Sequence, residues 1–292
     1  MSSLLKPEIL NTVEGLELLA RIIVEEYLSG ANNSNRVGVG QEFSQYRSYQ
    51  AGDDLRLLDW KMYARSERFY IKQSEIETHI TVKFFLDASA SMLHEENKIK
   101  KIEFARVLIA TLAYLANKQG DKIGLYAVND KSPMQLTPGL SAQYFHRFLY
   151  QLLNVKIEGV WPQYLEKGDM VSEHKEMIIF ISDMYEHQDE LQRFITGLKT
   201  NRNEVLVFHL VSQNELDLSY KGVTVFEDLE TGKKVQINTV QAKKKYQKRM
   251  MKKIDSIREN MLENQIAYEL FNTSEPLGER IFEFLQRRKS LL

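Results

Sequence analysis

The chain has 292 residues, of which 43% are hydrophobic and 27% are charged, and its formal net charge is −1. These values are ordinary for a folded, water-soluble protein, and they give no overall electrostatic attraction to nucleic acid or to anionic membranes. The chain has no cysteine, which excludes disulfides, thiolate nucleophiles and cysteine-bound zinc and is compatible with a reducing cytoplasm.

The first 79 residues begin with an amphipathic helix and continue without regular periodicity. Apolar side chains recur at helical spacing over residues 16–28, with charged residues between them. A polar cluster at residues 29–35 ends this pattern. The segment that follows, up to about Thr78, is rich in arginine, aspartate and aromatic residues. We expect residues 1–79 to form an N-terminal region that packs on the main domain.

From residue 80 onward, short apolar runs typical of buried strands alternate with patterns typical of amphipathic helices. This alternation predicts a three-layer α/β fold, in which helices cover both faces of a mostly parallel, Rossmann-like sheet. We expect residues 80–292 to form this domain. The predicted strands are 82–86, 123–128, 177–181, 205–211 and 266–271, and the predicted helices are 99–116, 144–153, 191–198 and 277–288.

Residues 220–264 are predicted to elaborate the domain rather than to extend its sheet. Two short strands, 223–228 and 234–237, are joined by a loop that contains Gly232, a pattern typical of a β-hairpin. A long charged helix follows at about 240–264. Its basic run at 243–253 carries apolar residues at helical spacing, which indicates an amphipathic helix with a solvated basic face.

The same basic run has a second interpretation, since a basic helix can also follow nucleic-acid phosphates. We favour the packed helix and expect no nucleic-acid partner. No stretch of the sequence approaches the roughly 20 apolar residues that span a bilayer, so we expect no membrane span and a cytoplasmic location.

The end of the first predicted sheet strand carries the polar group with the clearest chemistry. The apolar run 82–86 stops at Asp87, and Ser89 and Ser91 follow at alternate positions. Carboxylate and hydroxyl oxygens are the ligands that hard cations such as Mg²⁺ prefer. The alternative is that Asp87 and the serines cap turns before the next helix, where Asp and Ser are also favoured.

Asp183 follows another predicted strand, 177–181, after Ser182. Because the carboxyl ends of parallel strands line the crevice where ligands bind, we expect Asp87 and Asp183 to meet there. Asp87, Ser89, Ser91 and Asp183 are therefore our candidates for a magnesium site, with Asp183 acting directly or through water. The same four residues are our candidates for binding a partner.

The pattern D-x-S-x-S at Asp87 resembles the metal-ion-dependent adhesion site of von Willebrand factor A-type domains. The resemblance implies a bound divalent ion that keeps one coordination position open for a carboxylate of another protein, without chemistry. In such sites a loop between the two acidic strand ends supplies a Thr, usually after a Gly. Here the loop is 158–161, and Trp161 stands in place of the Thr. Indole cannot ligate a cation, so we expect a degenerate site unless another oxygen, such as the Thr137 hydroxyl, substitutes.

A longer motif precedes the first sheet strand. It consists of G-x-E-F at 40–43, R-x-Y-x-x-G-D-D-x-R-x-x-D-W at 47–60, and A-R at 64–65. This closely resembles the signature of the bacterial family catalogued as domain of unknown function 58, and the match extends to Ser182, Asp183, the hairpin loop and residues 272–277. The resemblance implies a von Willebrand factor A-like fold. It also implies partnership with a MoxR-type AAA+ ATPase in a system that assembles or activates other complexes.

The signature segment also has a physical interpretation of its own. Residues 52–54, Gly-Asp-Asp, suit a tight turn. The charged residues around it are predicted to form a buried ion-pair network that organises the segment, with a docking surface as the alternative. We expect Trp60 to lie in the core. The charged residues of the predicted network are Arg47, Arg56, Asp59 and Arg65.

A magnesium-dependent hydrolase acting on phosphate esters is the alternative function. A phosphohydrolase of the haloacid dehalogenase type also places an Asp after its first buried strand, but it needs a second Asp two positions later as general acid. Ser89 stands at that position. No Walker-type phosphate loop is present and no histidine pair has metal-ligand spacing, with His209 predicted to be a satisfied core residue. We therefore expect a binding protein rather than an enzyme.

Overall fold

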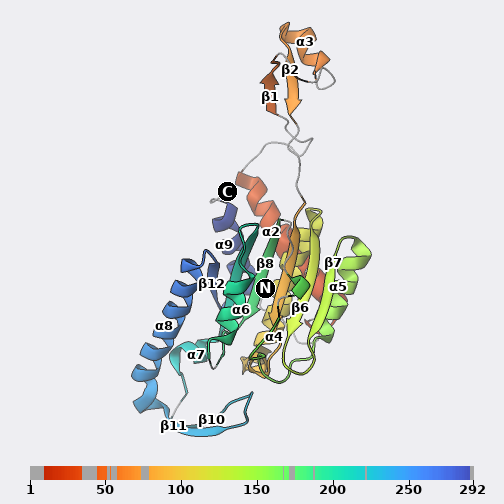
Figure 1. Ribbon diagram of the computed structural model, residues 1–292. Helices are drawn as coiled ribbons and strands as arrows, with labels where there is room; N and C mark the ends of the chain where they lie inside the picture. Colours follow the sequence, from red (N-terminus) through yellow and green to blue (C-terminus); the bar gives the residue numbers. More distant parts are fainter. Residues whose placement is uncertain are drawn as a thin grey trace. The chain divides into compact units, whose positions relative to one another are not determined.

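The computed structural model describes residues 10–34, 45–50, 53, 58–73, 79–166, 168–170, 175–186, 188–220 and 222–289 (Figure 1). The chain divides into one unit of residues 1–29 and 80–292 and a second unit of residues 30–79. Most of the opening helix thus belongs to the same unit as the sheet, and the signature segment belongs to the second unit.

The larger unit is built on a six-stranded sheet in the order β12-β9-β8-β3-β6-β7. Neighbouring strands are parallel except for β7, which runs antiparallel to β6 at one edge. The sequence predicts every strand but β7, whose segment lacks a long apolar run and contains a proline, a residue that sheets tolerate at an edge. The strands are β3 (Thr81–Asp87), β6 (Lys122–Val128), β7 (Met134–Gly139), β8 (Glu176–Ser182), β9 (Asn203–Val211) and β12 (Ala267–Asn272).

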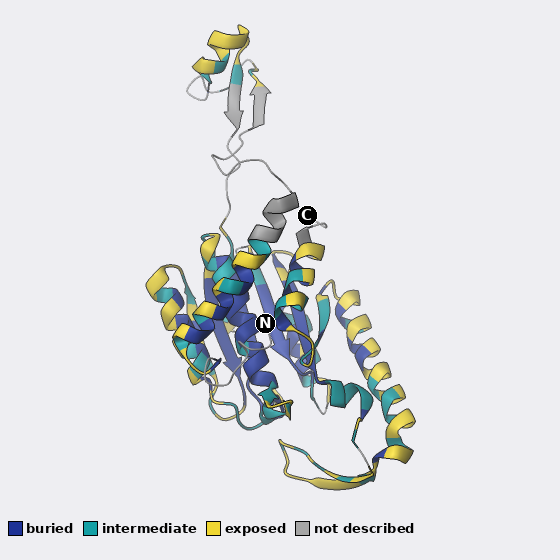
Figure 2. Cartoon of the chain, turned by 180° about the vertical axis from the view of Figure 1, so that it is seen from behind, coloured by how far each residue is buried: buried dark blue, intermediate teal, exposed yellow. Residues whose placement is uncertain are grey.

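Helices cover both faces of this sheet. Side chains alternate along each strand, so Phe84 and Leu86 of β3 pack against one helix layer and Phe85 packs against the other. Burial on both faces explains why the strands are nearly continuous apolar runs. The first layer contains α2 (Val13–Ser34), α4 (Lys101–Lys118), α5 (Ala142–Asn154) and α9 (Leu277–Lys289), and the second contains α6 (Glu190–Leu198) and α8 (Thr239–Glu263). Figure 2 shows the buried sheet between exposed outer helix faces, and the predicted three-layer α/β architecture with a mostly parallel sheet is confirmed.

Smaller elements connect the strands and helices of the larger unit. The predicted hairpin is present as an antiparallel pair, β10 and β11, directly before α8. The predicted helix at 99–116 begins two residues later because Ile99 and Lys100 pair with β4 as a short strand. The sequence does not predict α7. These elements are η2 (Ala90–Leu93), β4 (Glu95–Glu96), β5 (Ile99–Lys100), η3 (Gly168–Met170), α7 (Gln213–Asp217), β10 (Val223–Glu227) and β11 (Lys234–Asn238).

The long helix α8 has the amphipathic character that the sequence predicts. Ile254, Ile257 and Met261 are buried, while most lysines of its basic run are exposed. The basic residues thus form a solvated face.

The smaller unit contains strand β1 (Gln45–Ser48) paired antiparallel with β2 (Tyr70–Gln73), and helix α3 (Trp60–Ser66) between them. Trp60 is 63% exposed, so its prediction as a core residue is wrong. It opens a short helix without a buried face, and its ring meets only the edge-on ring of Tyr63 among the described aromatic contacts.

The charged residues of the signature segment organise local turns. Asp53 accepts a hydrogen bond from the backbone N–H of Gln50 at 2.8 Å, as expected for a tight turn. Asp59 caps α3 by accepting from the backbone N–H groups of its first turn. Arg65 is exposed, which contradicts its place in a buried network. The side chains of Arg47 and Arg56 lie outside the described residues.

Candidate functional site

Two carboxylates meet at the carboxyl edge of the sheet. Leu86 of β3 and Ile181 of β8 are register partners, so the residues that follow them, Asp87 and Ser182, emerge side by side. Ser182 Oγ donates to Asp87 Oδ2 at 2.7 Å. Asp183 is the next residue, and it enters the same crevice, where open parallel sheets bind their ligands.

The two serine hydroxyls connect the carboxylates. Ser89 Oγ and Ser91 Oγ lie 2.9 Å apart, and Ser91 Oγ donates to Asp183 Oδ1 at 3.2 Å. Asp87 and Ser89 are fully buried, and Ser91 and Asp183 are 8% exposed. The structure therefore brings all four predicted residues into one buried, hydrogen-bonded cluster, which we call the Asp87 cluster.

The turn-capping alternative describes only part of this arrangement. Asp87 Oδ1 accepts the backbone N–H of Ser89 at 3.0 Å, as a turn-capping Asp does. Ser89 is the N-cap residue of η2, but its side chain makes no capping hydrogen bond. Its hydroxyl instead faces Ser91.

A buried lysine, Lys101, completes the site. Its Nζ lies 2.9 Å from Asp183 Oδ2 and 2.7 Å from Glu215 Oε1, and the residue is 2% exposed. Lys101 is the first residue of α4, where the helix dipole disfavours a positive charge. A lysine at this position is a sequence signal for a nearby acidic partner. The sequence-based prediction of the site did not include Lys101.

The electrostatics of the cluster separate the two aspartates. Burial and the nearby charge of Asp183 raise the pKa of Asp87 to about 6, against hydrogen bonds from Ser182 and Ser89. Burial also acts to raise the pKa of Asp183, but Lys101 outweighs it and the pKa is lowered. The pKa of Lys101 is raised because the two carboxylates overcome the effect of its burial. Asp183 and Lys101 thus form an ion pair, while Asp87 carries the unneutralised charge.

Glu215 holds Lys101 from the other side. Its second oxygen, Oε2, accepts from the backbone N–H of Ser212 at 2.8 Å and from the Ser212 hydroxyl at 2.9 Å. The Glu215 N–H donates in return to Ser212 Oγ at 3.3 Å, which completes a capping box at the start of α7. His94 Nε2 also lies 3.1 Å from Ser212 Oγ. The end of β9 and α7 therefore fix the position of the lysine.

His209, on β9, is buried and has its Nδ1 2.6 Å from the hydroxyl of Tyr268. This confirms its prediction as a satisfied core residue.

A third carboxylate reaches the cluster from the β10–β11 turn. The side chain of Glu230 interacts with that of Ser91. Its burial, together with the charges of Asp87, Asp183 and Asp228, raises its pKa to about 8. The sequence predicts the hairpin but not this contact.

The loop predicted to carry the missing Thr does border the cluster. The backbone N–H of Ala90 donates to Gly159 O at 3.0 Å, and that of Glu158 donates to Ala88 O at 3.0 Å. Trp161, however, is 3% exposed and packs against Phe180 and Phe194, with ring centroids 5.6 and 5.5 Å away. Its side chain has become part of the core instead of a ligand.

Thr137 cannot take over as the missing hydroxyl. It is exposed on β7, and β6 and β3 separate β7 from β8 in the sheet.

The donor set at the cluster fits one hard divalent cation. In the described ranges, no group of three or more acidic, histidine or cysteine side chains is arranged to hold a metal, so a cation here would depend on hydroxyls as well. Asp87, Ser89 and Ser91 supply oxygens only, and Lys101 is already shared by Asp183 and Glu215, so it leaves the charge of Asp87 without a partner. Because Lys101 occupies Asp183 Oδ2, we expect Asp183 to act through water.

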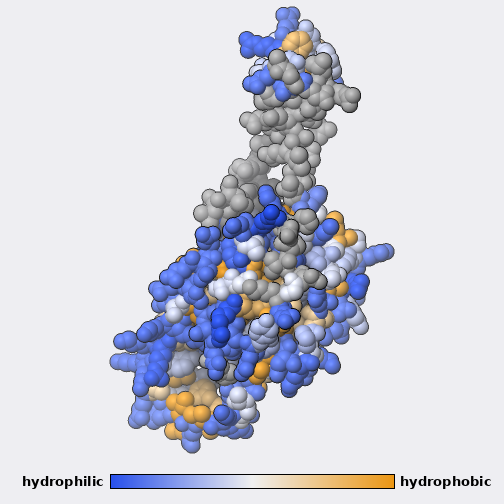
Figure 3. All heavy atoms as spheres, in the orientation of Figure 1, coloured by the Kyte–Doolittle hydropathy of each residue, from blue (hydrophilic) through white to orange (hydrophobic). Residues whose placement is uncertain are grey.

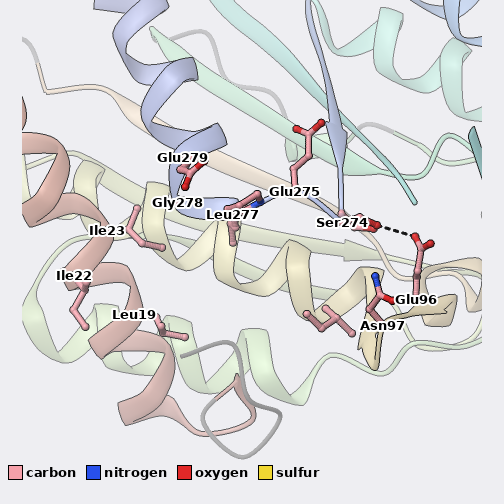
Figure 4. A pocket seen from close by; sticks show the side chains of 13 residues that line it. Leu19, Ile22, Ile23, Glu96, Asn97, Ser274, Glu275, Leu277, Gly278 and Glu279 are labelled. Atoms are coloured by element: carbon pink, nitrogen blue, oxygen red, sulfur yellow. Dashed lines mark hydrogen bonds between the residues drawn. The ribbon is translucent and has the colours of Figure 1, made fainter. Parts of the chain in front are cut away.

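A second cavity, of about 360 Å³, lies elsewhere in the larger unit (Figure 4). Leu19, Ile22 and Ile23 of α2 form one wall, and the β4–β5 turn and the start of α9 form the others. Ser274 Oγ donates to Glu96 Oε2 at 2.9 Å at its edge. None of the four predicted site residues lines it.

No helix in the described part of the chain is both long and apolar enough to cross a membrane.

Comparison with known proteins gives one family. The model of the family described as "Protein of unknown function DUF58" matches residues 45–256. An uncharacterized protein of Mycobacterium bovis, Mb1516, is 22% identical over 233 residues, which cover 77% of this chain and 72% of that protein. The uncharacterized protein Rv1480 of Mycobacterium tuberculosis matches with the same values.

Similar solved structures include the conserved hypothetical protein BatB of Bacteroides thetaiotaomicron. It is 14% identical, with a TM-score of 0.46, over 72% of this chain and 99% of that chain. The SpRpn10 VWA domain is 12% identical, with a TM-score of 0.37, over 69% of this chain and 92% of that chain.

Proposed function

We propose that this chain, which belongs to the DUF58 family of proteins of unknown function, is a non-enzymatic protein-binding module. Its partner inserts a carboxylate at the crevice of Asp87, Ser89, Ser91 and Asp183. The observation that carries the proposal is the convergence of these four side chains, from two strand ends, into one buried cluster. The Ser89 hydroxyl makes no capping hydrogen bond and faces Ser91, which supports a ligand at this position.

Mg²⁺ is the proposed bridge between the cluster and the partner. Asp87, Ser89 and Ser91 would hold the ion, and a magnesium ion held by so few protein ligands keeps waters that a carboxylate can replace. The unneutralised charge of Asp87 supports a cation at this position.

The proposed partner is a MoxR-type AAA+ ATPase or the client protein of such a system. The family resemblance supports this choice, and so does the lack of a Walker-type loop in the sequence, since a partner would then supply ATP hydrolysis. We propose a cytoplasmic location, in keeping with the absence of cysteine.

A binding titration tests the metal-bridged contact. A purified MoxR-type ATPase is titrated with this chain by biolayer interferometry, with Mg²⁺ and with EDTA. We expect Asp87→Ala and EDTA each to weaken binding at least tenfold, because each removes the bridge. Asp255→Ala, which changes a carboxylate with a 53% exposed side chain on α8, is the matched control. If neither Asp87→Ala nor EDTA changes the affinity, the metal-bridged mechanism is refuted.

Phosphate-ester hydrolysis is the competing function. In the haloacid dehalogenase arrangement it requires an Asp two positions after Asp87 as general acid, and that residue is Ser89, whose hydroxyl lies 2.9 Å from that of Ser91. We expect no turnover of an aryl phosphate in the presence of Mg²⁺. Turnover that Asp87→Ala abolishes would establish the hydrolase instead.

A further inference from the structure

The turn between β10 and β11 places a carboxylate where the proposed partner would place its own. Glu230 lies in this turn, and its side chain interacts with Ser91, whose hydroxyl donates to Asp183. It also lines a pocket of about 220 Å³ together with Trp161 and Tyr185. A residue 139 positions from Ser91 in sequence thus contacts the centre of the Asp87 cluster.

The turn is shaped to present this side chain. Asp228 Oδ1 accepts the backbone N–H groups of Glu230 and Thr231 at 2.9 and 3.1 Å. Its other oxygen, Oδ2, accepts the hydroxyl of Tyr185 at 3.0 Å. Tyr185 in turn donates its backbone N–H to Asp183 Oδ1 at 3.1 Å. Asp228 therefore holds the turn closed and ties it to the segment that carries Asp183.

The strands of the hairpin have no comparable anchorage to the sheet. In the described part of the chain, β10 and β11 pair only with each other. Val223, Val225 and Val235 are 56–60% exposed, and Figure 3 shows apolar side chains gathered at the lower end of the view, where β10 and β11 lie in Figure 1. An isolated two-stranded ribbon is only marginally stable in water, so little energy opposes its movement.

We propose that the β10–β11 turn is an internal ligand of the Asp87 cluster, and that the external ligand is an acidic turn of the same kind on a partner protein. This inference rests on the proposed function of the cluster as a carboxylate-binding site. The partner's turn would carry a Glu at its tip and a turn-closing Asp two residues before it, as Asp228 and Glu230 are spaced here.

An internal ligand regulates the site by competition. A site that the turn covers nine-tenths of the time binds an external ligand about tenfold more weakly than an open one. A divalent cation would strengthen both contacts, since each places a carboxylate beside Asp87 and Asp183. The partner must therefore displace Glu230 before it binds.

The test uses the full chain and a defined probe. The probe is a fluorescent cyclic peptide with the sequence of residues 226–235, and its binding is measured by fluorescence anisotropy with Mg²⁺ present. We expect it to bind the Glu230→Ala variant at least tenfold more tightly than the unchanged chain. Glu227→Ala, on the same hairpin with a 52% exposed side chain, is the matched control and should bind the peptide as the unchanged chain does. A peptide with Gln in place of Glu230 should bind neither the unchanged chain nor either of the two variants.

A second measurement needs no external ligand. With Trp60→Phe in the background, Trp161 is the only tryptophan of the chain, and it lines the same pocket as Glu230. Glu230→Ala should increase acrylamide quenching of Trp161 fluorescence, and Glu227→Ala should not. Equal quenching in the Glu230→Ala variant and its parent, or equal peptide affinity, would overturn the internal ligand.

These outcomes are separate from those that test the proposed function. If ATPase binding ignores Asp87→Ala while Glu230→Ala still exposes Trp161, the partner assignment fails and the internal contact stands. If ATPase binding depends on Asp87 while Glu230→Ala changes neither quenching nor peptide affinity, the proposed function stands and the internal ligand is refuted.

Discussion

Lys101→Met tests the role of the buried ion pair beside the proposed metal position. Methionine keeps most of the length of the side chain but removes the charge that neutralises Asp183, which lies 2.9 Å from Nζ. Removing one partner of a buried pair costs about 3–5 kcal/mol, because the remaining charge is left without compensation. We expect a loss of this size, with the smaller share from Glu215, whose side chain is 27% exposed and keeps contact with water.

The same substitution should make stability depend on Mg²⁺. Without Lys101, both oxygens of Asp183 face the cluster, so a divalent cation can take over the neutralising role. A cation at ten times its dissociation constant stabilises the folded state by about 1.4 kcal/mol. We expect Mg²⁺ to restore at least this much to the Lys101→Met variant and to stabilise the unchanged chain less.

Lys83→Met is the matched control. Lys83 is also a buried lysine, 3% exposed, and its Nζ lies 2.6 Å from Glu176 Oε2. Its pair lies away from the Asp87 cluster, because Lys83 is four residues before Asp87 on β3 and Glu176 opens β8. This variant should lose a similar free energy of unfolding, yet Mg²⁺ should restore none of it.

Urea unfolding followed by circular dichroism measures the loss of stability and its recovery with Mg²⁺. The experiment is done with and without about 10 mM MgCl₂, a concentration that fills a site with a millimolar dissociation constant. If Mg²⁺ stabilises the two methionine variants equally, the cation does not act at Asp183 and the argument for the site fails. A loss below about 1 kcal/mol for Lys101→Met would show that the pair is solvated, as exposed pairs are.

Two further predictions concern His209 and Gly159. Burial lowers the pKa of His209 to about 4. The neutral ring therefore stabilises the fold fully above the unfolded pKa of about 6.5 and progressively less as the pH falls toward 4. The loss of stability between pH 7 and pH 5 is about 2 kcal/mol. Urea unfolding of His209→Gln should lack that part of the pH dependence, and an identical pH profile would contradict it. Gly159→Ala should destabilise the chain by at least about 1–2 kcal/mol, because Gly159 has a φ of +69° and an added Cβ would collide with the Asp130 carboxylate. Gly222→Ala is its control, with a φ of +73° and open space around the Cβ, and equal losses in the two variants would show that the collision is relieved.

Local patterns in the sequence were sufficient for every strand of the sheet except β7 and for part of the site. Buried strands read as apolar runs because both faces are covered, and amphipathic helices show a period near 3.6, so each element leaves its own signal within a few residues. Asp87 and Asp183 meet as expected because each stands at the end of such a run, Asp183 after Ser182, and parallel strands end at one edge. The core position predicted for Trp60 was wrong, because aromatic character alone does not show whether a short helix has a buried face.

The rest of the site depends on contacts between distant parts of the chain. Lys101 contacts Asp183, which is 82 positions away in sequence, and Glu215, which is 114 positions away. Glu230 interacts with Ser91 from a hairpin that the sequence predicts only as an elaboration of the domain. The sequence by itself determined which elements form, where they end and which polar residues stand at those ends, because these follow from local burial and hydrogen bonding. Only the tertiary structure decided which charge neutralises which carboxylate, because that depends on the packing of α4, α7 and the hairpin around one crevice, and no local periodicity records it.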